Sequence, residues 1–113
     1  MKSKITSLSK NIEFKSLLNG KKISNKYSTI FFKKLSNKNV KKLNVSFVAK
    51  KKLGNAVVRN RIKRRLRNIM NEAIKKININ LNYSYLIIAK KMIFEDKYEN
   101  IKKIFFIDFK KIK

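Results

Sequence analysis

Residues 50–67 read KKKLGNAVVRNRIKRRLR, and this stretch decides the fold because a long helix is predicted to begin inside it. Gly54 interrupts the chain, and Asn55 is a residue type that caps helix N-termini. From Ala56 to about Asn78 the apolar positions fall within one arc of about 100° on a helix; they are Val58, Ile62, Leu66, Ile69, Ala73 and Ile77. We therefore predict a helix over 56–78 that packs one face on a core.

The opposite face of this predicted helix is strongly basic. All five arginines of the chain lie in its first half, and every other cation is a lysine. A guanidinium binds phosphate through a planar fork of donors and stacks on bases, whereas an ammonium is a point charge. Lysine would be sufficient if only charge were needed, so the clustering predicts a surface that recognises phosphate. The arginines are Arg59, Arg61, Arg64, Arg65 and Arg67.

The charge of the whole chain also favours a nucleic-acid partner. The 113 residues carry a net charge of +25, and no acid lies between Glu13 and Glu72. A field of one sign over this length suits a nucleic acid or another acidic surface. A biased amino-acid composition would explain the many lysines but not the arginine cluster. The length corresponds to one domain, residues 1–113.

Several other classes of protein are disfavoured by what the sequence lacks. It has no cysteine and no histidine, which removes thiolate and imidazole metal ligands and the usual nucleophile–base pairs. Its only acid cluster, Glu95, Asp96 and Glu99, lies at a predicted helix start, where acids offset the helix dipole. We predict no catalytic side chain and no protein-bound metal. The start of the chain lacks the apolar core of a signal peptide, and no apolar run is long enough for a membrane span, which predicts a cytoplasmic protein.

The remaining elements complete an α+β pattern. A short helix is predicted over 11–18, followed by Gly20, and a second over 97–110. Strands are predicted over 27–35, 43–49 and 83–89, with a polar turn at 36–39. The strand over 43–49 alternates, which predicts one buried face made by Leu43, Val45, Phe47 and Ala49. Residues 1–9 are polar and basic, and we expect them to be disordered.

The stretch 50–67 resembles the signature of the bacterial ribonuclease P protein family. The resemblance rests on a basic pair, then Gly-Asn-Ala-Val, then Arg-Asn-Arg and Lys-Arg at the head of a helix, in order and without a gap. An early Asn-x-x-Phe helix, the aromatic strand at 27–32 and a Tyr-Leu-Ile-Ile-Ala-Lys strand extend it over about residues 8–106. It implies a four-stranded, mostly antiparallel sheet flanked by three helices, in the order α-β-β-β-α-β-α, with a left-handed parallel crossover.

The resemblance also implies a function, that of the protein subunit of ribonuclease P. Such a subunit binds the catalytic RNA and the 5′ leader of precursor tRNA, while the RNA performs the cleavage with Mg²⁺ that it mainly binds itself. No membrane and no small-molecule substrate is implied. The residues that inherit contacts with the catalytic RNA are Lys51, Lys52, Asn55, Arg59, Asn60, Arg61, Lys63, Arg64 and Arg67.

A second set of residues inherits a cleft for the single-stranded leader. The set is Phe14, Leu18, Phe31, Ser46 and Val48. Leu18 stands where the family often has an aromatic residue and Phe31 where it often has tyrosine, which implies weaker stacking and one missing hydroxyl contact. Ordinary core packing is the alternative role for Phe14 and Leu18.

Two other functions fit part of the same sequence. A small ribosomal protein that binds ribosomal RNA would have this size and charge, but it does not account for the ordered signature at 54–67. A basic amphipathic protein at a membrane surface would use the C-terminal Ile-Phe-Phe-Ile-Asp-Phe stretch, but it leaves the arginine cluster unexplained.

Overall fold

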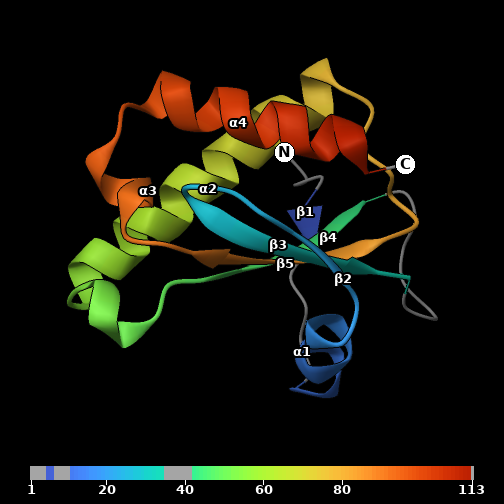
Figure 1. The fold of residues 1–113 in the computed structure, drawn as a ribbon, viewed down its shortest axis with the longest axis horizontal. Coiled ribbons are helices and arrows are strands. Elements are labelled where there is room, and N and C mark those ends of the chain that lie inside the picture. The colour runs from blue at the N-terminus through green and yellow to red at the C-terminus, as the bar shows by residue number, and fades with distance from the viewer. Residues whose placement is uncertain (1–4, 7–10, 35–41, 113) are drawn as a thin grey trace.

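The computed structural model describes residues 5–6, 11–34 and 42–112, with side chains over 15–34 and 42–112. The chain forms an α+β fold with one sheet (Figure 1). The strands are β1 (Ile5–Thr6), β2 (Lys21–Ser24), β3 (Ser28–Lys33), β4 (Leu43–Val48) and β5 (Ser84–Ala89). The helices are α1 (Asn11–Leu18), α2 (Ala56–Lys76), α3 (Met92–Glu95) and α4 (Tyr98–Lys111), with a 3₁₀ turn, η1, at Lys51–Leu53.

The sheet is mixed, with strand order β1-β4-β5-β3-β2. Among the four longer strands, the β2–β3 and β3–β5 pairs are antiparallel and the β4–β5 pair is parallel, which confirms the mostly antiparallel sheet. The parallel pair is joined by α2, which makes α2 the crossover helix. β5 lies between β3 and β4, and its apolar sequence suits this central position.

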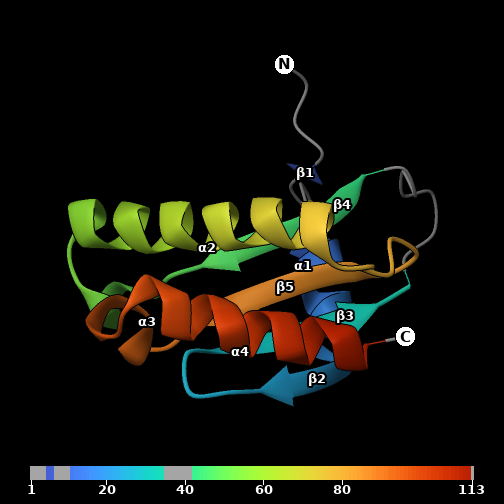
Figure 2. The ribbon, with the colours of Figure 1, turned by 90° about the horizontal axis from the view of Figure 1, so that it is seen from above.

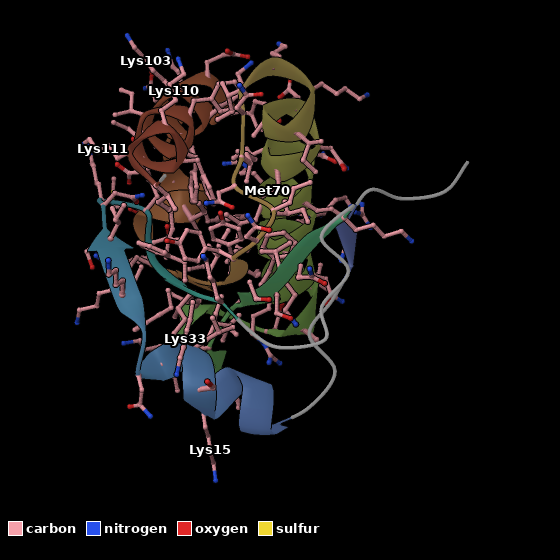
Figure 3. All side chains as sticks on the ribbon, turned by 90° about the vertical axis from the view of Figure 1, so that its right-hand side faces the viewer. Lys15, Lys33, Met70, Lys103, Lys110 and Lys111 are labelled. Carbon is pink, nitrogen blue, oxygen red and sulfur yellow. The ribbon has the colours of Figure 1, made fainter. Side chains whose placement is uncertain are left out.

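The helices cover both faces of the sheet. α2 and α4 lie side by side on one face and α1 lies on the other, as Figures 1 and 2 show. The main core fills the space between the sheet and the α2–α4 layer. Met70 of α2, labelled in Figure 3, is fully buried in this core, although the predicted apolar stripe omitted it. None of the helices in the described parts of the chain combines the length and the apolar character needed to cross a bilayer.

Three details differ from the sequence-based predictions, and one prediction is left untested. Ile5 and Thr6 form β1, which pairs in parallel with β4, although disorder was expected over 1–9; the rest of that segment lies outside the described residues. The short helix α3 was not predicted. β4 is buried on both faces, not one, since Asn44 and Ser46 are buried as well as Leu43 and Val45. The predicted turn at 36–39 lies outside the described residues.

Candidate nucleic-acid interface

The start of α2 is built by Gly54 and Asn55. The Oδ1 of Asn55 accepts a hydrogen bond from the backbone N–H of Val58 at 3.0 Å, which confirms the predicted N-cap. Gly54 has φ of 149°, and a Cβ there would come within 2.9 Å of the Val58 side chain. Glycine is therefore required at this position by conformation and by space. Immediately before it, η1 presents Lys51 and Lys52, both exposed.

The outer face of α2 carries most of the predicted RNA-binding residues in exposed positions. They are Asn60, Arg61, Lys63, Arg64 and Arg67. Arg59 is only half-exposed, and its Nε is buried without a hydrogen-bond partner among the described residues. The apolar residues Ile62, Leu66 and Ile69 between them are buried, so the helix is amphipathic as predicted. The exposed cations on this face are available to an anionic partner.

Arg65 is an exception to the predicted outward-facing cluster. It is half-buried, and its Nη1 donates hydrogen bonds to the backbone carbonyls of Ile93 and Asp96, each at 3.1 Å. These carbonyls belong to the end of α3, where a helix leaves carbonyl groups without intrahelical partners. Arg65 therefore joins α2 to the α3–α4 segment, and it is not part of the exposed basic face of α2.

The predicted leader cleft lies on the sheet face that α1 covers in part. Phe31 and Ser46 are both cross-strand neighbours of Leu86, and Val48 is a neighbour of Ile88, so the three predicted sheet residues share one face. Leu17 of α1 is fully buried against Leu86 in a small cluster that includes Phe31 and Val48. The three predicted sheet residues therefore lie together, and their role in binding a leader stays a prediction.

Of the two α1 residues that were predicted to line the cleft, only Leu18 has a described side chain. Leu18 is 47% exposed, so it is not a core residue and it is available to a ligand. Leu17, next to it, makes the core contact instead. The side chain of Phe14 lies outside the described side chains, and its assignment stays a prediction.

A cavity of about 430 Å³ lies between the 3₁₀ turn and the sheet face of the predicted cleft, and most of its residues were not predicted from the sequence. Thr29 and Ile88 contribute from the cleft face of the sheet, and Lys52 contributes from η1. In the sequence, the two consecutive lysines directly after the central strand β5 could have indicated the positively charged side of this cavity. The remaining residues around it are Lys50, Leu53, Ala89, Lys90 and Lys91.

Among the acids with described side chains, three accept hydrogen bonds that fasten one element of the fold to another. The hydroxyl of Tyr27 donates to Asp96, and this hydrogen bond is the main cause that lowers the pKa of Asp96 to about 2. The hydroxyl of Tyr98 donates to Glu72 at 2.6 Å and lowers the pKa of that carboxyl. Asn25 donates to Asp108 at 2.8 Å. No three of these acids gather into a possible metal site within the described part of the chain.

The Ribonuclease P family model matches residues 2–113. The chain belongs to the ribonuclease P protein family. A ribonuclease P protein component from Fusobacterium nucleatum subsp. nucleatum is 44% identical over 107 residues, covering 88% of this chain and 89% of the relative. One from Mycoplasma capricolum subsp. capricolum is 32% identical over 106 residues, covering 94% of each chain. Membership decides against the ribosomal-protein and membrane-surface alternatives.

Solved structures of ribonuclease P proteins share this fold. The protein from Thermotoga maritima superposes with a TM-score of 0.79 at 22% identity, covering 96% of this chain and 98% of that one. A Staphylococcus aureus ribonuclease P protein gives a TM-score of 0.75 at 23% identity, covering 94% and 93%. At this identity the likeness concerns the fold alone, and it confirms the single α+β architecture that the resemblance implied.

Proposed function

We propose that this protein is the RNA-binding subunit of ribonuclease P and assists removal of the 5′ leader from precursor tRNA. The observation that carries the proposal is the continuity of two surfaces. The exposed basic face of α2 leads through η1 and its cavity to the half-apolar cleft under the sheet. A folded RNA and a single strand that emerges from it could be held together by such a pair of surfaces.

The two surfaces suit two kinds of RNA contact. On α2, exposed guanidinium groups suit phosphates, and these groups would bind the catalytic RNA. In the cleft, the half-exposed ring of Phe31 and the aliphatic side chains of Val48 and Ile88 suit unstacked bases. Lys52 borders both surfaces and would follow the backbone between them. The precursor tRNA leader is the single strand that the proposal places in the cleft.

The cleavage chemistry in this proposal belongs to the RNA. Metal-assisted cleavage of a phosphodiester needs converging oxygen ligands. Glu72, Asp96 and Asp108 instead accept hydrogen bonds from tyrosine or asparagine side chains in the described structure. These residues do not fit a resident Mg²⁺ site, so the metal would be held by the RNA. The relatives are bacterial, and the cytoplasmic location expected from the sequence belongs to the same proposal.

The test is reconstitution of cleavage. The purified protein is added to a bacterial ribonuclease P RNA at a Mg²⁺ concentration at which the RNA alone is nearly inactive, and cleavage of a precursor tRNA is followed. We expect cleavage at the 5′ end of the mature tRNA to be restored. A variant with Arg61 and Arg64 replaced by Ala should fold but restore much less. A folded wild-type protein that restores no cleavage with any bacterial ribonuclease P RNA would refute the proposal.

A further inference from the structure

One arginine of the α2 face is held in place by a protein side chain before any RNA binds. The guanidinium carbon of Arg67 lies over the ring of Phe47, 5.6 Å from its centroid. This separation is within the range in which a cation is attracted to the face of an aromatic ring. Arg67 is otherwise exposed, and no described acceptor takes a hydrogen bond from its guanidinium. Arg61 and Arg64 have no comparable contact among the described residues.

The position of Phe47 explains how this contact arises. Phe47 belongs to β4 and projects from the face that α2 covers, beside the buried Val45. Its side chain is half-buried, so part of the ring packs against the core and part is left for Arg67. An aliphatic residue would fill the packed part equally well. Only an aromatic residue offers a charged neighbour a ring face.

The same strand also contributes residues to the face where the leader cleft is predicted. Ser46 and Val48, on either side of Phe47 in sequence, project to the opposite face of β4, where the predicted leader cleft lies. The Arg67–Phe47 pair and the cleft are therefore separated by the thickness of one strand. Along β4, described pairing with β1 ends at Asn44, so no described strand covers the edge beside Phe47. Arg67 therefore lies on the α2 side of β4, beside a strand edge that no described strand covers.

We propose that Phe47 is a positioning residue that fixes the Arg67 guanidinium for an RNA phosphate at this edge of the sheet. The proposal rests on the function proposed above. A free arginine side chain loses much rotamer freedom when it binds, and that loss opposes binding. A ring face restricts the guanidinium beforehand, while the N–H fork remains available to phosphate. Arg67 then contributes more to RNA affinity than Arg64, which carries the same group without such support.

The test is a double-mutant cycle between Phe47 and Arg67. Affinity for a ribonuclease P RNA is measured for the wild type, Phe47→Leu, Arg67→Ala and the double variant, with a thermal melt for each. We expect Phe47→Leu to weaken binding about two- to five-fold, the size of an exposed cation–π contact. In the Arg67→Ala background the same change should have no effect. Phe47→Tyr keeps the ring face and should bind like the wild type.

Two controls separate positioning from packing. A parallel cycle between Phe47 and Arg64 should be additive, because these two residues make no contact. In the free protein, NMR relaxation of the arginine Nε–H groups should show Arg67 becoming more mobile in Phe47→Leu and Arg64 unchanged. Equal weakening by Phe47→Leu in the presence and absence of Arg67 would overturn the inference. So would an Arg67 that is as mobile in the wild type as in the variant, whether or not RNA binds.

Failure of the proposed function gives a different result. A wild-type protein that shows no affinity for ribonuclease P RNA would refute the proposed function. The Arg67–Phe47 pair would then have no RNA phosphate to bind. The NMR result would then still report whether Phe47 restrains Arg67. Wild-type RNA affinity together with an unaffected Phe47→Leu variant would remove only the positioning role.

Discussion

At the scale of single residues, the five neighbouring arginines have different surroundings and therefore different roles. Arg65 and Arg64 are adjacent in sequence, but one is half-buried with two carbonyl partners and the other is exposed without any described partner. A guanidinium can serve two carbonyls at once because its donors diverge in one plane. Within one helical turn, one arginine therefore fastens two elements of the fold together and the next stays exposed to solvent.

Replacing Arg65 with Ala should lower stability and leave RNA affinity nearly unchanged. The change leaves the carbonyls of Ile93 and Asp96 without their donor, and the loss of such bonds costs about 1–3 kcal/mol. Arg64→Ala should have the opposite effect, with an unfolding free energy within about 0.5 kcal/mol of the wild type and weaker RNA binding. Urea unfolding and RNA titration of both variants test the pair. Similar losses of stability and of RNA affinity in both variants would contradict this difference in role between Arg65 and Arg64.

The residues that could be predicted from sequence are those whose role is local. Asn55 and Gly54 were predicted correctly because a helix N-cap depends on bonds within three residues. Arg65 was misplaced because its partners lie 28 and 31 residues further along the chain. The cavity lysines after β5 were missed for the same reason, since only the fold brings them next to η1.

At the scale of elements, α1 places two adjacent leucines in different surroundings. Leu17 is fully buried and Leu18 is 47% exposed. Leu17→Ala should therefore cost about 2–5 kcal/mol of stability, because it removes a packed side chain and leaves a cavity. Leu18→Ala should cost less than about 1 kcal/mol and should weaken precursor tRNA binding while sparing mature tRNA. Denaturant unfolding and paired binding constants for the two tRNAs measure both effects.

A gain-of-function variant strengthens the same test. Leu18→Phe would supply a ring where the family often has one, and a stacked base is worth about 1–3 kcal/mol. Affinity for precursor tRNA should rise by up to that amount, with no change for mature tRNA. An equal change for both tRNAs would place Leu18 outside the leader cleft.

The basic face of α2 predicts a particular dependence of binding on salt. If roughly six phosphates are neutralised by α2 and η1, the slope of log affinity against log salt should be about −4 to −5, between the values for single strands and duplexes. Replacing Arg64 with Ala should make the slope less steep by under about one unit. RNA titrations over a series of salt concentrations measure the slope. A slope near zero would mean that stacking in the cleft, not phosphate contact, dominates binding.

Long, regular elements were predicted from sequence and short ones were not. The amphipathic pattern of α2 and the apolar run of β5 are strong signals, and both elements were found within a few residues of the prediction. α3 has four residues and β1 has two, which is too short for any periodicity to show. β2 reads KKIS at an exposed sheet edge, so its strand character comes from pairing with β3 and not from its own composition.

At the scale of the whole molecule, the few acids are placed where they hold α4 and the β2–β3 turn together. Asp96 accepts hydrogen bonds from Tyr27, from Asn100 and from the backbone of Lys97, and Glu72 accepts one from Tyr98. The α1 face and the first half of α2 carry no acid with a described side chain. Among the described side chains, the exposed charges of the first half of α2 are therefore all positive. The sequence showed the scarcity of acids, but not their pairing with tyrosines far away in the chain.

The pairing of Asp96 predicts how stability depends on pH. The hydrogen bond from Tyr27, followed by those from Asn100 and Lys97, lowers the pKa of Asp96 from 3.8 to about 2 in the folded protein. Because the folded pKa is the lower one, the contribution of Asp96 is complete above about pH 4 and is lost as pH falls toward 2. The melting temperature of the wild type should therefore fall steeply in this window, where the net charge of the acid-poor chain also rises.

The variant Asp96→Asn isolates the contribution of this one carboxyl to the pH dependence of stability. Asparagine can still accept a hydrogen bond from Tyr27 but has no charge to lose, so the variant should be less stable than the wild type at pH 7 and should lose less between pH 4 and pH 2. The two melting curves should converge near pH 2. Glu95→Gln is the matched control, because Glu95 is 48% exposed and makes only a surface ion pair with Lys91, 3.8 Å away. A constant difference between wild type and Asp96→Asn from pH 7 to pH 2 would mean that Asp96 stabilises α4 by its shape and hydrogen bonds alone, and not by its charge.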